Sequence, residues 1–422
     1  MTFDAIFVPD GLSEAVSERA WLQAMLDFER ALAAAEAQAG VIPEGAAEAI
    51  AAGCIEPLHL DVDGARAAGN PAEPLVRALR KRVGVDAAGY VHWGATSQDV
   101  LDHAAMLVSR HALALVLEEL DGVAAACARL ARAHRGTVMA ARTLLTQAVP
   151  TTFGAKAAGW LVSVVEARAR LRSWQPAVEL GGAAGTLAAL GDKGLDVLRL
   201  LAEELGVDEP AAPWHTNRVR VAELGNALAV AAGVCAKIGL DVALLEQTEV
   251  GEVREPVGSG GSSTMPHKRN PVGSALAVAC AKRVGAAASV LTGALVQEHE
   301  RAVGGWQAEW SALSEALALT GGAAWHIRVV LDGLEVDAER MRANLGELTA
   351  AEHASFVLSE RVGREKAHEL VADAARRPSF RDGLLAAGLS DAEVEEVLDP
   401  TTYLGASDAF VDRAVALYEA QA

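Results

Sequence analysis

The stretch Gly258-Ser-Gly-Gly-Ser-Ser-Thr-Met-Pro-His-Lys-Arg-Asn-Pro271 joins a glycine- and serine-rich run to a cationic helix start. The glycines restrain the backbone little, so we expect the first half to act as a mobile lid. Asn270 is a good N-cap and Pro271 suits a first helical turn, which predicts a helix from about Pro271. Its free N–H groups favour a carboxylate or phosphate, to which Lys268 and Arg269 can add positive charge. The stretch therefore predicts an anion-binding loop rather than a solvated linker.

Long alanine-rich segments dominate the rest of the chain, and alanine has the highest helix propensity. Several of them exceed about 25 residues, which predicts a bundle of long helices packed lengthwise. The glycines of 181–185 follow no apolar strand and lack GxGxxG spacing, so we expect a turn there and no dinucleotide loop. The predicted helices cover about 13–38, 97–134, 150–174, 219–250, 271–299 and 307–344.

The composition is that of a large globular protein. A chain of 422 residues with 51% hydrophobic content can bury a sizeable core, and its length suggests two or three domains. No run of about twenty residues is both apolar and uncharged, and the N-terminus lacks the order of a signal peptide, so we expect a cytoplasmic protein that binds no membrane. The net charge of −19 argues against nucleic acid as a partner. An anionic ligand must then meet a locally basic pocket.

Three domains are predicted from changes in the helical pattern. The long-helix pattern weakens near 345–360 and gives way to a tail of short helices. We therefore expect an N-terminal helical domain (1–96), a central long-helix bundle (97–346) and a small C-terminal helical domain (347–422). The four cysteines are scattered without CxxC spacing and are expected to be reduced core thiols: Cys54, Cys127, Cys235 and Cys280.

The Gly258–Pro271 stretch resembles the GSSxMPxKxNP loop of the fumarase/aspartase superfamily, whose members add a nucleophile reversibly across a double bond next to a carboxylate. Two further motifs occur in the order that the superfamily requires: His92-Trp-Gly-Ala-Thr-Ser-Gln-Asp-Val100 and Arg142-Thr-Leu-Leu-Thr-Gln-Ala-Val-Pro-Thr-Thr-Phe-Gly154. Four others are similar to the 3-carboxy-cis,cis-muconate cycloisomerase branch: Gly69-Asn-Pro71, Gly181-Gly-Ala-Ala-Gly-Thr186, Pro213-Trp-His-Thr216 and Trp306-Gln-Ala-Glu-Trp310.

The resemblance covers nearly the whole chain and implies an all-α fumarase/aspartase-type lyase fold. It also implies a homotetramer with a twenty-helix core, in which each active site takes motifs from three subunits. The implied ligand is a small anionic polycarboxylate. We expect no cofactor and no metal, because the histidines form no HxxxH pair and the chemistry needs only fixed protein charges.

By this resemblance the loop supplies the proton-transferring group. Pulling a proton from a carbon next to a carboxylate leaves a dianion that needs strong, fixed electrostatics. Ser262 matches the proton-transferring position and is the expected catalytic residue, with Ser263 as the competing candidate and a substrate-binding neighbour. An alkoxide there would need nearby positive charge and exclusion of water. Lys268 and Asn270 match residues that bind a substrate carboxylate. Met265 of the same motif is also expected to contact the substrate.

The turn at Thr96-Ser97-Gln98-Asp99 is predicted to start a helix, with Thr96 and Asp99 at the spacing of a capping box. The resemblance also implies that this turn binds a substrate carboxylate, with Ser97 first and Thr96 beside it. His92 matches a histidine that lies in the active site of the adenylosuccinate lyase branch, so it is a catalytic candidate. A packing role for His92 stays open.

The second motif departs from the wider superfamily at two positions. Many relatives carry a histidine after the threonine to protonate the leaving group, and here that position is Leu144. A carboxylate leaves as a stable anion without such an acid, whereas an amine or hydroxide does not. Gln147 stands where some relatives have histidine. Arg142, Thr143 and Gln147 are expected to hold substrate carboxylates.

The resemblance implies the cycloisomerisation of 3-carboxy-cis,cis-muconate to 4-carboxymuconolactone in protocatechuate degradation. The missing acid fits this reaction, because a tethered carboxylate needs orientation more than activation. The alternative is a related β-elimination lyase acting on a substituted succinate, such as nitrosuccinate or adenylosuccinate; the missing acid counts against adenylosuccinate. A non-catalytic structural protein is a remote alternative. Arg301 could meet a third carboxylate or form an ion pair on a helix face.

Overall fold

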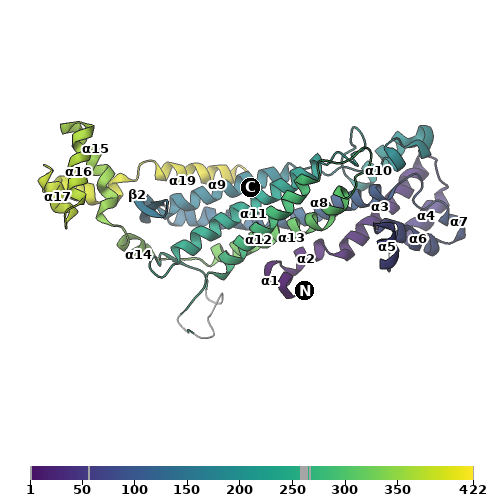
Figure 1. Cartoon of the computed structure of the whole chain (residues 1–422), viewed down its shortest axis with the longest axis horizontal. Coiled ribbons are helices and arrows are strands. Elements are labelled where there is room, and N and C mark those ends of the chain that lie inside the picture. Colours follow the sequence, from purple (N-terminus) through teal and green to yellow (C-terminus); the bar gives the residue numbers. More distant parts are fainter. Residues whose placement is uncertain (1, 56–57, 257–264, 266–267, 422) are drawn as a thin grey trace. The chain divides into compact units, whose positions relative to one another are not determined.

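The computed structural model describes residues 2–55, 58–256, 265 and 268–421 (Figure 1). Helices dominate this part of the chain, which confirms the all-α fold. Its framework consists of five long helices: α8 (Ser97–Ala133), α9 (Phe153–Arg172), α11 (Val219–Leu245), α12 (Val272–Gly293) and α13 (Gly305–Asp332). Ser262, Ser263 and His267 lie outside the described residues.

Further helices, most of them shorter, precede and interrupt these five. They are α1 (Thr2–Phe7), α2 (Asp10–Ala15), α3 (Glu18–Gln38), α4 (Glu44–Gly53), α5 (Val62–Ala68), α6 (Ala72–Val83), α7 (Val85–Ala88), η1 (Gly182–Ala184), η2 (Ala188–Lys193) and α10 (Gly194–Leu205). Apolar residues of α3, α4, α6, α10 and the first turns of α8 pack into one buried cluster. This cluster holds the start of α8 in place, which matters because the Thr96–Ser97 turn lies there.

A second buried cluster belongs to the C-terminal helices, from Ala350 to Val397. The elements after α13 are α14 (Ala338–Ala343), η3 (Glu347–Ala350), α15 (Ala351–Val362), α16 (Arg364–Ala375), α17 (Phe380–Ala386), α18 (Asp391–Leu398), η4 (Pro400–Tyr403) and α19 (Ser407–Glu419). α18 begins with a capping box between Ser390 and Glu393. The predicted change to short helices is therefore confirmed.

The strands of the described residues form two short antiparallel pairs. β1 (Val138–Thr143) and β2 (Thr146–Thr152) make a hairpin, in which Arg142 faces Gln147 and Thr143 faces Thr146. β3 (Val253–Arg254) pairs with β4 (Glu335–Val336). The sequence analysis did not predict the hairpin, because its turn residues are two leucines instead of the usual asparagine and glycine.

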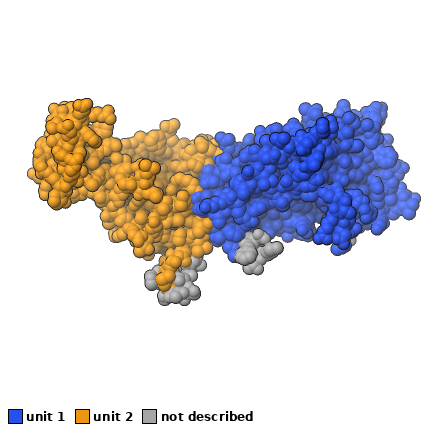
Figure 2. All heavy atoms as spheres, in the orientation of Figure 1, with its two compact units in different colours: residues 1–120, 167–236, 276–325 blue, residues 121–166, 237–275, 326–422 orange. Residues whose placement is uncertain are grey.

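The chain divides into two compact units, each built from three separate stretches (Figure 2). Unit 1 comprises residues 1–120, 167–236 and 276–325, and unit 2 comprises residues 121–166, 237–275 and 326–422. The boundaries 1–96, 97–346 and 347–422 stay a prediction. The units show where the expected site residues gather: the His92 and Thr96–Ser97 motif lies in unit 1, and the Arg142 motif and Lys268 lie in unit 2.

Three long helices carry more apolar surface than one chain buries. α8, α11 and α12 are long and apolar enough to cross a membrane by length and composition. Only 44% of the most apolar window of α11 and 33% of that of α12 are buried. The exposed apolar residues include Val219, Val230 and Leu240 on α11 and Val290 on α12. Apolar surface of α11 and α12 is thus left exposed on the single chain.

Glu36 of α3 is a buried acid whose two carboxyl oxygens have no hydrogen-bond partner among the described residues. Burial, with the nearby Glu29, raises the pKa of Glu36 to about 9. The folded chain thus holds a proton that the unfolded chain releases above about pH 4.5, so this group lowers stability as the pH rises from about 4.5 to 9.

Glu36→Met is therefore expected to stabilise the protein at pH 7.5, by about 2–4 kcal/mol, and to leave stability at pH 4.5 nearly unchanged. Thermal unfolding at the two pH values, at one protein concentration, measures the difference. Glu48→Met, which removes an exposed acid of α4, is the control and is expected to change little at either pH. An equal gain for Glu36→Met at both pH values would mean that packing, not proton binding, is responsible.

Candidate functional site

The Thr96–Ser97 turn is organised by a buried carboxylate two residues further along. Ser97 begins α8, and the backbone N–H of Thr96 donates to Oδ2 of Asp99 at 2.9 Å. Asp99 is fully buried, whereas Thr96 and Ser97 are half-buried. Half of the predicted capping box is thus present, and the turn leaves its hydroxyl-bearing residues partly accessible.

Asp99 also binds the glycine turn of residues 181–185. Its Oδ1 accepts from the N–H of Gly181 and its Oδ2 from that of Gly182, both at 3.1 Å. Gly182 has a φ of 65°, and a Cβ atom there would lie 2.8 Å from the carbonyl oxygen of Gly94, so only glycine fits. The turn expected in place of a dinucleotide loop is confirmed, and it lies against the Thr96 motif.

His215 completes this network, with Nε2 2.5 Å from Oδ1 of Asp99 and 3.5 Å from Oε1 of Glu179. Burial, with Asp102 and Asp99 nearby, raises the pKa of Glu179 well above its ordinary value. Asp99, Glu179 and His215 are close enough together for a metal site. However, both Asp99 oxygens already accept two N–H donors each, so the group is better suited to orienting the two turns than to holding a cation.

A buried ion network continues along α8. Arg218, directly before α11, donates to Asp102 at 2.7 and 2.9 Å and to Glu309 of α13 at 3.0, 3.2 and 2.5 Å. All three side chains are at most 3% exposed. Trp306 Nε1 donates to Asp102 Oδ1 at 3.0 Å. The network ties three helices together within unit 1.

His92 lies four residues before Thr96, with a strained φ of 63°. Its Nδ1 is 2.6 Å from Oε1 of Glu29, and both side chains are largely buried. Burial alone would lower the pKa of His92, but the Glu29 carboxylate outweighs it and raises the pKa. The imidazole is therefore oriented by a carboxylate and favours its charged form, which suits an acid or an anion-binding group.

Arg301 lies in the loop between α12 and α13, and its Nη2 donates to the carbonyl oxygen of Gly182 at 2.5 Å. The ion pair on a helix face is therefore excluded, because residues 298–301 are not helical. Through Gly182 and Asp99, the half-buried guanidinium is joined to the Thr96 turn. Unit 1 thus brings together the hydroxyl-bearing Thr96 and Ser97 and the cationic Arg301, with His92 on the segment directly before them.

In unit 2 the hairpin is anchored by Arg142. Its guanidinium makes two hydrogen bonds to the fully buried Glu252, at 3.0 and 2.6 Å. Asn344 Nδ2 donates to the same carboxylate at 2.9 Å. On the facing strand, Gln147 donates to the Asn344 carbonyl oxygen at 2.7 Å and accepts from the Gly346 N–H at 3.1 Å. Arg142 and Gln147, two of the three residues of this motif expected to hold substrate carboxylates, therefore bind groups of the chain itself.

The hairpin turn consists of Leu144 and Leu145, with φ values of 50° and 66°. Positive φ at both positions is the geometry of a type I′ turn, and each left-handed leucine costs about 1–2 kcal/mol. Their side chains are 99% and 77% exposed. Thr143 and Thr146, which flank them, are exposed as well. The tip thus presents two hydroxyls and two apolar side chains and has no acid or base.

The start of α12 differs from expectation. The N–H groups of Gly273 and Ser274 donate to the carboxylate of Glu255, at 3.1 and 2.9 Å, so an internal anion occupies the helix start that was expected to bind substrate. Lys268 and Met265 are exposed and Asn270 is half-buried. The Lys268 N–H donates to the Met265 carbonyl oxygen at 3.0 Å. Lys268 is thus accessible to an anion from outside unit 2.

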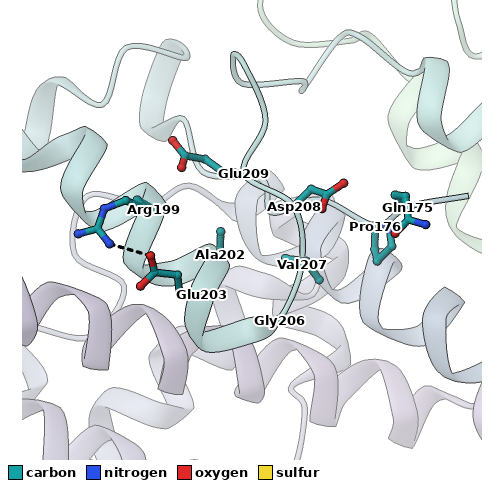
Figure 3. Close-up of a pocket in the computed structure, with 9 residues that line it drawn as sticks. All are labelled: Gln175, Pro176, Arg199, Ala202, Glu203, Gly206, Val207, Asp208 and Glu209. Atoms are coloured by element: carbon teal, nitrogen blue, oxygen red, sulfur yellow. Dashed lines mark hydrogen bonds and ion pairs between the residues drawn. The ribbon is translucent and has the colours of Figure 1, made fainter.

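A shallow hollow of about 390 Å³ in unit 1 lies between α10 and the segments 175–176 and 206–209 (Figure 3). It is lined by three acids, Glu203, Asp208 and Glu209, and by Arg199, which donates to Glu203 at 2.7 Å. Its lining includes none of the expected site residues. A net negative wall repels a polycarboxylate, so we do not assign this hollow to the site.

Sequence reasoning missed the internal partners Glu29, Glu252, Glu255 and Asn344. The sequence contains a signal for two of them, Glu252 and Glu255. In Glu252-Val-Arg-Glu255, shortly before the Gly/Ser stretch, one acid stands on each side of a short strand. Acids are rarely buried without a partner. Which cation or helix start each acid binds depends on segments far away in the chain.

Comparison with known proteins places this chain among lyases. The model of a lyase family matches residues 8–285. A 3-carboxy-cis,cis-muconate cycloisomerase of Pseudomonas aeruginosa is 46% identical and aligns with 99% of this chain and 96% of its own length. A nitrosuccinate lyase of Streptomyces davaonensis is also 46% identical, over 95% of this chain and 91% of its own. The crystal structure of the 3-carboxy-cis,cis-muconate lactonizing enzyme from Pseudomonas putida has a TM-score of 0.92 at 42% identity and covers 99% of each chain.

Proposed function

This chain belongs to the lyase family, and we propose that it is a cycloisomerase that converts 3-carboxy-cis,cis-muconate to 4-carboxymuconolactone. In this reaction a carboxylate oxygen of the substrate bonds to a carbon of its own double bond, and the adjacent carbon takes up a proton. The main support for this proposal is the composition of the hairpin tip. Its four residues, Thr143, Leu144, Leu145 and Thr146, include no acid that could protonate a leaving group. A carboxylate, as nucleophile or leaving group, needs none.

Each part of the site has a proposed role. The Thr96–Ser97 turn and Arg301 bind carboxylates of the substrate, and His92, oriented by Glu29, is the second catalytic candidate. Lys268 and Asn270 bind a further carboxylate, with Met265 beside them. Ser262 transfers the proton, and Ser263 is its alternative. Arg142 and Gln147 hold the hairpin and leave the Thr143 hydroxyl to reach the substrate.

We infer that the site is shared between subunits of a cytoplasmic homotetramer. The three motifs resemble those of a superfamily in which each active site takes residues from several subunits, and we propose that another copy supplies the second motif here. The exposed apolar residues of α11 and α12 fit the core of that assembly.

Val230→Glu should test the assembly, because it places a charge on the exposed apolar face of α11. We expect loss of the tetramer and at least a tenfold loss of activity, since each site needs several copies. Light scattering coupled to size-exclusion chromatography measures the mass. Ala114→Glu, on an exposed position of α8, is the control for an added charge. A fully active tetramer of Val230→Glu would remove α11 from the interface.

The reaction itself is tested by mixing the purified protein with 3-carboxy-cis,cis-muconate and following the loss of diene absorbance. Rapid loss with lactone formed supports the cycloisomerase. A folded tetramer that leaves the diene unchanged contradicts it. Nitrosuccinate is the second candidate substrate, because a nitrosuccinate lyase is equally similar and nitrite also leaves as a stable anion. Release of nitrite would identify that activity.

A further inference from the structure

The hairpin tip has two properties that neither folding nor solubility favours. Leu144 and Leu145 both adopt positive φ, although a type I′ turn strongly prefers Asn-Gly. Both leucines also expose most of their apolar surface. Strained backbone conformations concentrate at functional sites, where the surrounding structure enforces them. Two adjacent left-handed leucines at an exposed tip therefore indicate a function for their side chains.

The tip is also held rigidly. The two residues that bracket it, Arg142 and Gln147, face each other across the hairpin. Arg142 is fixed by the buried Glu252, and Gln147 is fixed by the backbone of Asn344 and Gly346. Both strands are thus anchored directly next to the turn. Such a tip presents its side chains in one orientation, as a binding surface requires.

The chemistry of the tip limits what it can contact. Two isobutyl groups lie between the hydroxyls of Thr143 and Thr146, and none of the four side chains is charged. The apolar groups suit a hydrocarbon segment, and the hydroxyls suit polar groups on either side of it. An unsaturated carbon chain with carboxylates at its ends has this pattern, whereas a short saturated succinate offers much less apolar surface.

We propose that Leu144 and Leu145 are specificity-determining residues, an inference that rests on the proposed function. The tip of one subunit packs its two leucines on the unsaturated carbons of a substrate bound by the Thr96–Ser97 turn of another copy. There the leucines exclude water from the reacting carbons and favour the diene over substituted succinates. The strain in the turn positions both side chains on the same substrate.

The first test replaces the two leucines with Asn-Gly, the residue pair that the backbone of this turn prefers. Leu144→Asn/Leu145→Gly is expected to keep the tetramer and to retain or raise the melting temperature, because Asn-Gly relieves the turn. At the same time kcat/KM for 3-carboxy-cis,cis-muconate should fall at least about 30-fold. Leu195→Asn removes an exposed leucine of α10 and is expected to leave activity unchanged. A double variant that is stable and fully active overturns the proposal.

A second pair of variants tests whether the tip needs apolar side chains or only side chains of a similar length. Leu144→Met/Leu145→Met and Leu144→Gln/Leu145→Gln carry side chains of similar length, and only the first remains apolar. We expect the methionine variant to stay within about threefold of the native kcat/KM and the glutamine variant to lose more than about tenfold. Equal activities overturn the proposal, even if the Asn-Gly variant fails to assemble.

A third measurement distinguishes failure of this proposal from failure of the proposed function. All variants are assayed on 3-carboxy-cis,cis-muconate and on nitrosuccinate. If the native protein converts only nitrosuccinate, the proposed function is wrong. The proposal on the leucines then fails with it, because it assigns them a preference for the diene; a native protein that converts the diene, with variants of equal activity, overturns the proposal on the leucines alone. For a native cycloisomerase, the glutamine variant is expected to lose more activity on the diene than on nitrosuccinate.

Discussion

Ser262→Ala is expected to lower kcat by about 10²–10⁴-fold, because it removes the hydroxyl proposed to exchange a proton with the carbon next to a carboxylate. Steady-state kinetics with 3-carboxy-cis,cis-muconate measure the loss. KM should change much less than kcat, since the carboxylates are bound by other residues.

Ser263→Ala is the matched control, because it removes a hydroxyl from the next residue of the same motif. We expect a loss of less than about tenfold for it, and unchanged mass and circular dichroism for both variants. The reverse outcome, with Ser263→Ala inactive and Ser262→Ala active, would assign the proton transfer to Ser263. Near-native activity of both variants would contradict a serine as the proton-transferring residue.

Arg218→Met is expected to lower the free energy of unfolding by about 3–5 kcal/mol, because it leaves two buried carboxylates without their cation. Burial alone would lower the pKa of Arg218, but Asp102 and Glu309 raise it above its ordinary value, so the guanidinium stays charged. Burial raises the pKa of Glu309, and Arg218 opposes this. Without Arg218, Glu309 is expected to take up a proton and Asp102 to lose its bidentate partner.

Denaturant unfolding at a fixed protein concentration measures this loss, since assembly makes stability depend on concentration. Arg199→Met is the control: it breaks an exposed ion pair with Glu203 on α10 and should cost less than about 1 kcal/mol. Replacing Asp102, Arg218 and Glu309 together by apolar residues should recover part of the stability. If Arg218→Met unfolds within about 1 kcal/mol of the native protein, the network does not stabilise unit 1.

Sequence periodicity located the long helices well and their ends less well. The prediction of 97–134 differs by one residue from α8, Ser97–Ala133, because a capping motif marks its start. The prediction of 271–299 extends beyond α12, which ends at Gly293. Leu295 and Val296 are apolar and prolong the pattern, yet both lie outside the helix. Helix propensity does not reveal where such a helix ends, because tertiary contacts decide its last residue.

The sequence by itself determined the helical fold, the order of the three motifs and the residue types that contact the substrate in the proposed mechanism. These properties depend on local propensity, on apolar periodicity and on short motifs whose members are neighbours in the chain. Only the tertiary structure decided which polar groups stay accessible. Glu252 binds Arg142 across more than a hundred residues of chain, and Glu255 occupies the start of α12. The physical reason is that a buried charge must find its partner in space, and sequence spacing does not encode that partner.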